Sequence, residues 1–351
     1  MNYYSPRIFF VILFSFILII TACTFDKTDI NDKTDKIVFM AGFKAQANLP
    51  FAGVYVAQEM GFFAEENLKV EIRHSVSGGT LSLLAAKEID ITTSDAATLV
   101  KTVANQDVPL TIFALIGQVG QQSFVSLEKS NITSPKDWEG KVFGYKGSPP
   151  PEYLAILKAN QVERSNIEEV RVGYNPVVLT NGDVDILAVF RSNEPNIIET
   201  KLGYPVKIWS PYDYNLPVLG LTYVTHEDIL NNRSEEITKF LRAVIKALYY
   251  IVDNEEQSIE IIMKYAQNED ESHQIYMLRS EIKDAWSPIT KENGLGWMTD
   301  KQWNSFYSYL KESGVLKKDI DINKVYTTSI LDKVYNDDNN RLNIKKLNYN
   351  D

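Results

Sequence analysis

The stretch FAGVYVAQEMGFF at residues 51–63, followed by NLKVEI at residues 67–72, decides the fold of this chain. Its pattern predicts a helix over Gly53–Glu66 and a strand over Lys69–Arg73, and a β-branched run predicts an earlier strand over Lys36–Met40. A strand, a helix and a second strand in this order form a βαβ unit. We therefore expect an α/β fold with mainly parallel sheets flanked by helices.

The same alternation continues downstream. Helices are predicted over Thr80–Glu88 and Ala96–Asn105, and strands over Asp90–Thr93 and Leu110–Ile116. A second set comprises strands over Ser123–Leu127, Lys141–Tyr145, Glu168–Gly173, Asp185–Phe190 and Val206–Trp209, and helices over Glu152–Asn160 and Pro195–Lys201. The last third is helical, with Ser234 as the expected N-cap of its first helix and further helices over Gln257–Ala266, Ser272–Trp286 and Asp300–Ser313.

Strand-rich first and middle thirds followed by a helical last third are typical of a two-lobed receptor. We expect lobe one to comprise residues 36–122 and 222–335, and lobe two to comprise residues 123–221. A polar tail follows at residues 336–351.

The N-terminus predicts an exported lipoprotein. Arg7 precedes an apolar run over Ile8–Ile20, which is too short to span a bilayer comfortably but suits a secretion signal. The residues that end at Cys23, ITAC, resemble a bacterial lipobox, which implies that residues 1–22 are removed and that Cys23 is lipidated. The polar segment 23–35 is then a tether, and the protein works outside the cytoplasm, anchored to the cell membrane. A short uncleaved anchor is the alternative.

Composition excludes several function classes. The formal net charge of −10 argues against a nucleic-acid partner. No nucleotide-binding glycine motif, nucleophile elbow, HExxH or CxxC motif is present. The three histidines, His74, His226 and His273, are too scattered in the sequence to suggest a metal site. We expect no metal and no cofactor.

Small and polar residues recur where strands pass into helices. In an open α/β sheet these junctions meet at the crevice beyond the carboxyl ends of the strands, where free backbone N–H groups can bind a polar ligand. Ordinary helix capping is the alternative for any one of them. The predicted ligand-binding residues of this kind are Asn48, Ser77, Gly78, Ser94 and Asp95 from lobe one, and Gly147, Ser148, Asn193 and Glu194 from lobe two.

Residues 51–63 and 67–72 together resemble the opening of periplasmic-type binding proteins of the thiamine-precursor, sulfonate and nitrate group. The segment TSPKDWEGKV at residues 133–142 and the segment GDVD at residues 182–185 are similar to two later segments of that family. With the order of elements, the resemblance covers residues 37–326. It implies the two-lobed, type II periplasmic-binding-protein-like fold, a small-molecule ligand, and a monomer that serves an ABC permease and its ATPase.

Members of this family bind sulfonates, nitrate, the aminopyrimidine precursor of thiamine, or riboflavin. Asp95 and Glu194 would repel a sulfonate or nitrate, whereas carboxylates suit a ligand that donates hydrogen bonds. The aromatic run WSPYDY at residues 209–214 offers Trp209 and Tyr212 for stacking on a flat ring, although such runs also pack in cores. Asn193 would match the imide edge of riboflavin, and Glu194 an aminopyrimidine.

The resulting hypothesis is an importer's binding subunit for a thiamine aminopyrimidine precursor first and riboflavin second. A sulfonate, taurine or nitrate receptor of the same fold and an adhesive surface lipoprotein are the alternatives. The family fold also includes the eukaryotic thiamine pyrimidine synthase, an enzyme with an essential lysine, histidine and cysteine-rich motif. Its lysine and histidine align with Ser94 and Thr98 here, and Cys23 is the only cysteine, so we expect no enzyme.

Overall fold

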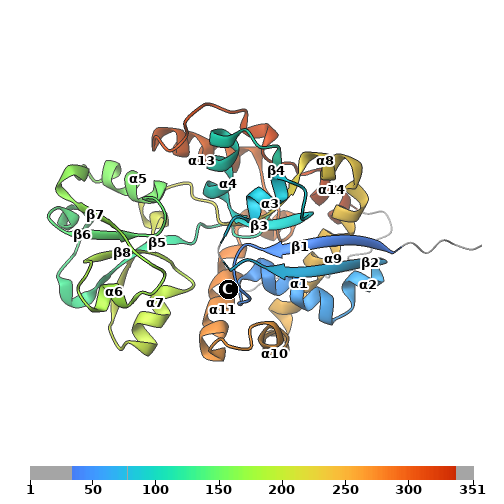
Figure 1. The fold of residues 1–351 in the computed structure, drawn as a ribbon, viewed down its shortest axis with the longest axis horizontal. Coiled ribbons are helices and arrows are strands. Elements are labelled where there is room, and N and C mark those ends of the chain that lie inside the picture. Colours follow the sequence, from blue (N-terminus) through green and yellow to red (C-terminus); the bar gives the residue numbers. More distant parts are fainter. Residues whose placement is uncertain (1–33, 77, 337–351) are drawn as a thin grey trace, which may run out of the picture. The chain divides into compact units, whose positions relative to one another are not determined.

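The computed structural model describes residues 34–76 and 78–336. Its first sheet has five strands in the order β2–β1–β3–β10–β4. β1 pairs in parallel with β2 and with β3, while β10 runs antiparallel to β3 and to β4. The bounds are Asp35–Ala41 (β1), Leu68–His74 (β2), Ile91–Asp95 (β3), Leu110–Leu115 (β4) and Leu221–His226 (β10), and Figure 1 labels β1 to β4.

The second sheet repeats this plan with the order β7–β6–β8–β5–β9. β6 pairs in parallel with β7 and β8, and β5 runs antiparallel to β8 and β9. The bounds are Gln122–Leu127 (β5), Val142–Tyr145 (β6), Glu168–Arg171 (β7), Ile186–Phe190 (β8) and Val206–Trp209 (β9).

The expected α/β fold with two helix-flanked, mainly parallel sheets is confirmed, and each sheet is mixed because a single strand, β10 or β5, runs against the other four. β5 and β10 each follow a connection between the sheets, and both run against their neighbours. The two connections lie side by side: Gly220 N donates to Gly117 O at 2.9 Å, and Gly117 N donates to Leu221 O at 3.0 Å. The chain therefore leaves the first sheet after β4, builds the second sheet from the continuous run β5 to β9, and returns to the first sheet with β10.

The largest apolar core lies between the first sheet and the helices of the N- and C-terminal thirds. α1 packs on the long helix α9, which buries Phe240, Leu241 and Val244. The second sheet has a smaller apolar cluster on each face. The helices are Leu49–Glu59 (α1), Phe62–Glu65 (α2), Thr80–Ala85 (α3), Ala96–Gln106 (α4), Pro151–Ala159 (α5), Val177–Thr180 (α6), Glu194–Asn196 (α7), Glu227–Asn232 (α8), Ser234–Asp253 (α9), Glu255–Tyr265 (α10), Glu271–Ala285 (α11), Pro288–Asn293 (α12), Asp300–Glu312 (α13) and Ser329–Tyr335 (α14).

Two of the differences from the sequence prediction concern the beginnings and ends of helices. The helix expected over Gly53–Glu66 is interrupted, because Gly61 has a φ of 76° and separates α1 from α2. Ser234 is the first residue of α9 rather than its cap, a position taken by Arg233 without a side-chain capping bond. The Arg233 side chain instead forms an ion pair with Asp90.

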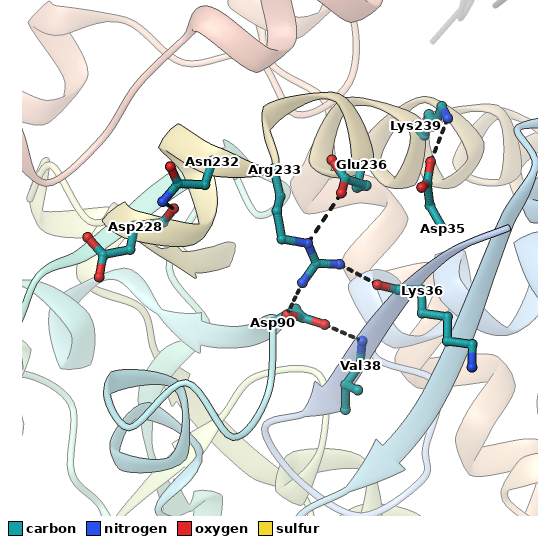
Figure 2. A network of polar contacts seen from close by, with 9 residues as sticks. All are labelled: Asp35, Lys36, Val38, Asp90, Asp228, Asn232, Arg233, Glu236 and Lys239. Atoms are coloured by element: carbon teal, nitrogen blue, oxygen red, sulfur yellow. Dashed lines mark hydrogen bonds and ion pairs between the residues drawn. The ribbon is translucent and has the colours of Figure 1, made fainter. Parts of the chain in front are cut away.

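Arg233 fastens the beginning of the folded chain to α9, as Figure 2 shows. Its guanidinium donates to Asp90 Oδ1 at 2.5 Å, to Glu236 Oε1 at 3.3 Å and to the carbonyl of Lys36. The other oxygen of Asp90 accepts from Val38 N at 2.7 Å. The first strand is thus held at the point where the predicted tether ends.

The predicted signal peptide, Cys23 and all but the end of the tether lie outside the described residues, as does the tail beyond residue 336. Within residues 34–76 and 78–336, no helix has the length and apolar character needed to cross a membrane. The same residues contain no group of three or more His, Cys, Asp or Glu side chains placed to hold a metal ion.

Candidate functional site

The candidate site lies at the loops that follow the parallel strands of both sheets. Lys146 comes directly after β6, and Glu194 begins α7 after β8. Their side chains form an ion pair in which Glu194 is only 3% exposed. The second carboxylate oxygen of Glu194 accepts from Phe190 N at 2.9 Å. Glu194 is therefore a paired carboxylate rather than a free one.

Two aromatic rings complete this group. The Lys146 Nζ lies 5.5 Å from the centroid of the Tyr174 ring, and the Phe43 ring lies 6.0 Å from Tyr174 at an interplanar angle of 39°. Phe43 follows β1 of the first sheet and Tyr174 follows β7 of the second sheet, so the contact joins the two sheets' loops. Tyr174 is 72% exposed although it is a large aromatic residue. We call Phe43, Lys146, Tyr174 and Glu194 the aromatic–ionic cluster.

The sequence prediction found Glu194 but missed the other three members of this cluster. Each of them follows a predicted strand by one to three residues, and that position was the available signal. None belongs to a motif, and only the tertiary contacts join them.

Asn193, predicted beside Glu194, faces helix α11. Its Oδ1 lies 2.9 Å from His273 Nε2, and Asn196 Oδ1 lies 2.8 Å from His273 Nδ1. His273 is buried, and this burial lowers the pKa of its imidazole. Asn193 and Asn196 therefore already have a protein partner in this structure.

Asn48 lies at the beginning of α1 and donates to Glu281 of α11. Glu281 Oε2 also accepts from Leu49 N at 2.7 Å, and its Oε1 accepts from Ser192 Oγ at 3.1 Å. Burial raises the pKa of Glu281 to about 7, against the effect of these three donors. Asn48 is thereby placed next to Ser192 and the loop that carries Asn193.

Asp95 caps α4 and accepts from Ala97 N at 3.0 Å and Thr98 N at 3.3 Å. Burial raises its pKa to about 6. Glu152 of α5 is also buried, and its pKa is raised to about 8, first by burial and then by the charge of Asp95. Asp95 thus lies near a second carboxyl group that the sequence did not indicate.

The remaining predicted residues are dispersed. Ser94 is buried and donates from Oγ to the Asp95 carbonyl at 3.0 Å, whereas Gly147 and Ser148 are exposed next to Lys146. Gly78 is exposed in a turn in which its N donates to Ser75 Oγ at 2.9 Å. Ser77 lies outside the described residues.

The structure corrects the prediction that Trp209 stacks on a ligand. It is 4% exposed in the core of the second sheet, edge-on to Trp138, and its Nε1 donates to Ser126 Oγ at 3.1 Å. Its ring is therefore used in packing and is not available for stacking on a ligand. Tyr212 is 65% exposed, and within the described part of the chain no ring contact joins it to the aromatic–ionic cluster.

Two curated relatives cover most of this chain. A formylaminopyrimidine-binding protein of Halalkalibacterium halodurans is 22% identical over 306 residues, which cover 84% of this chain and 90% of that protein. The riboflavin-binding protein RibY of Chloroflexus aurantiacus is also 22% identical, over 296 residues covering 81% and 83% of the two chains.

Solved structures show the same fold. The aliphatic sulphonate binding protein SsuA of Escherichia coli has a TM-score of 0.65 and 14% identity, covering 83% of this chain and 91% of that one. A desulfurization enzyme, DSZB, has a TM-score of 0.57 and 12% identity, covering 86% and 99%. The fold alone therefore does not separate receptors from enzymes. The NMT1/THI5-like family model matches residues 48–258, more than half of the sequence, and the chain belongs to that family.

Proposed function

We propose that this chain is the solute-binding subunit of an ABC importer and that it captures a small, flat nitrogen heterocycle. An aminopyrimidine precursor of thiamine is the first candidate and riboflavin the second. The observation that carries the proposal is the aromatic–ionic cluster, in which a buried carboxylate, an ammonium and two rings meet at the loops of both sheets. The names of the two curated relatives agree with this ligand class.

The chemistry of the cluster favours such a ligand. Tyr174 presents an exposed ring for stacking, and Glu194 accepts hydrogen bonds from a ring amino group. Lys146 can donate to a ring nitrogen once the ligand separates it from Glu194. A heterocycle with a donor beside an acceptor can therefore bond to Glu194 and to Lys146 at the same time, in place of their bond to each other.

A sulfonate or nitrate is the alternative ligand class, and Lys146 is the observation that favours it. The charge of Lys146 is, however, already compensated by Glu194, and an anion placed there meets a buried carboxylate. The sulphonate-binding neighbour shares the fold at low identity, which does not carry its ligand to this chain.

The same proposal includes the protein's place in the cell. The predicted lipobox at Cys23 would anchor a monomer to the membrane outside the cytoplasm, where it delivers the ligand to a permease driven by an ATPase. Binding in such a receptor needs ligand contacts and closure of the lobes, and no chemical step. Residues 36–122 with 222–335 and residues 123–221 are the proposed lobes.

A thermal-shift screen tests the proposal, because a ligand that binds only the native state raises the melting temperature. The probes are formylaminopyrimidine, riboflavin, taurine and nitrate, each followed for chemical change. We expect a shift with a heterocycle and no turnover. A shift with taurine or nitrate alone, no shift with any probe, or turnover of a probe would contradict the proposal.

A further inference from the structure

Helix α11 buries polar side chains along one face. His273, Gln274, Glu281 and Asp284 are each at most 4% exposed, and they lie within an arc of about 100° around the helix that also includes the apolar Met277. Other α11 residues, among them Met277 and Leu278, pack in the core of the first sheet. The helix therefore belongs with the first sheet, and its buried polar face needs an explanation beyond packing.

That polar face contacts the segment that follows β8 of the second sheet. Ser192 Oγ donates to Glu281 Oε1 at 3.1 Å, and Arg191 Nη2 donates to Asp284 Oδ1 at 2.5 Å. His273 meets the amide oxygens of Asn193 and Asn196 at 2.9 and 2.8 Å. The contacts extend from one end of α11 to the other, and each of them joins the half of the fold that contains the first sheet to the half that contains the second.

The same face also holds the beginning of α1. Gln274 Oε1 accepts from Ala47 N, and Glu281 Oε2 accepts from Leu49 N, both at 2.7 Å. A cavity of only about 10 Å³ lies beside Glu281 and Asp284, so the contact region is closely packed. Glu281 therefore bonds to both halves at once through a single carboxyl group.

We propose that the polar face of α11 is an interlobe clamp that holds the lobes together and positions the loop at residues 191–196. This inference rests on the proposed function, because that loop carries Glu194 of the aromatic–ionic cluster. Polar contacts suit a clamp that opens, because each polar group can bond to water when the lobes separate. An apolar contact would instead expose apolar surface to water, which is unfavourable. Glu281 and Ser192 are positioning residues, and neither needs to touch the ligand.

The clamp is tested without any ligand, by the distance between spin labels on the two lobes. The full chain carries Cys23→Ser, Glu88→Cys and Ser165→Cys, because Cys23 is the only native cysteine and both new sites are exposed. Ser192→Ala with His273→Leu removes interlobe hydrogen bonds and leaves no charge unpaired. We expect a longer and broader distance distribution, together with faster amide exchange at residues 191–196.

Ser126→Ala with His74→Leu is the matched control. This pair also removes bonds made by a buried serine and a histidine, to Trp209 and Tyr55, but each lies within one half of the fold. We expect the control to keep the label distance of the parent. An unchanged distance in the Ser192→Ala, His273→Leu chain, or an equal change in the control, overturns the clamp, and neither result depends on the ligand proposed above.

Discussion

At the scale of single residues, the pair of Lys146 and Glu194 sets the chemistry of the candidate site. Glu194 is almost fully buried, and a buried carboxylate is stable only when it is paired and hydrogen-bonded. A ligand that separates it from Lys146 must therefore supply donors of its own. Under the proposed function, this requirement favours ligands with ring amines or amides over anions.

Tyr174→Leu tests whether the exposed ring stacks on the ligand. A lost aromatic contact of about 0.5–1.5 kcal/mol corresponds to roughly a two- to twelvefold weaker affinity. We expect a loss of that size for formylaminopyrimidine in calorimetric titration. Tyr212→Leu is the matched control, because Tyr212 is similarly exposed but lies outside the cluster. Equal losses in the two variants would refute a stacking role specific to Tyr174.

Glu152→Gln tests the buried carboxyl group beside Asp95. The folded-state pKa of Glu152 is raised from 4.5 to about 8, so its contribution to stability is fully present below pH 4.5 and is lost as pH rises through 8. Glutamine does not titrate. We expect the melting temperature of Glu152→Gln, relative to the wild type, to rise between pH 5 and pH 9.

Asp137→Asn is the control for this pH dependence. Hydrogen bonds from Thr133 and Ser134 lower the pKa of Asp137 to about 2, so its titration ends below the tested range. The difference from wild type should stay constant between pH 5 and pH 9. A constant difference for Glu152→Gln as well would show that Glu152 is not a buried, protonated group.

The candidate residues could be predicted from sequence only in part. Glu194 and Asn193 follow a strand within a polar run, and that pattern marked them. Phe43, Lys146 and Tyr174 come from three separate loops, and no spacing in the sequence connects them. Trp209 shows the opposite case, because an aromatic run indicates either packing or stacking and only the core contacts decide.

At the scale of elements, the two connections between the sheets pass each other closely. A Cβ added at Gly220 would lie 2.6 Å from the Val119 carbonyl oxygen and 3.0 Å from that of Gly117. Both are backbone atoms and cannot rotate away. Glycine is therefore required where the connections pass each other.

Gly220→Ala should consequently destabilise the fold by about 1–3 kcal/mol, the cost typical of overpacking. Urea denaturation measures this change in the free energy of unfolding. Gly173→Ala serves as the control, because nothing lies within 4 Å of its added Cβ. A Gly220→Ala protein as stable as the control would mean that the connections separate without strain.

Most elements could be predicted because their apolar periodicity and their turn residues agree. β10 was not predicted as a strand, although the chain was expected to return near Thr222, because LTYVTH passes into α8 without a glycine or proline between them. α8, α12 and α14 have six or seven residues each, too few for a helical period to stand out. The antiparallel position of β5 in the second sheet and of β10 in the first sheet depends on two connections that are distant in the sequence and lie side by side, which local sequence does not encode.

At the scale of the whole molecule, the net charge and the chemistry of the candidate site both disfavour an anionic ligand. A formal charge of −10 disfavours the approach of anions, and the aromatic–ionic cluster offers no uncompensated cation. The fold is shared with a sulphonate-binding protein and with an enzyme, so it leaves the ligand open. The choice between ligand classes therefore depends on Glu194.

Calorimetric titration of formylaminopyrimidine and of taurine into the wild type and Glu194→Gln tests this central claim most directly. We predict that the wild type binds the heterocycle and not taurine. Glu194→Gln should lose about tenfold or more in heterocycle affinity, since a hydrogen bond to a charged group contributes about 1.5–3 kcal/mol, and should gain affinity for taurine as Lys146 loses its partner. Taurine binding to the wild type, or unchanged heterocycle affinity in Glu194→Gln, would contradict the account.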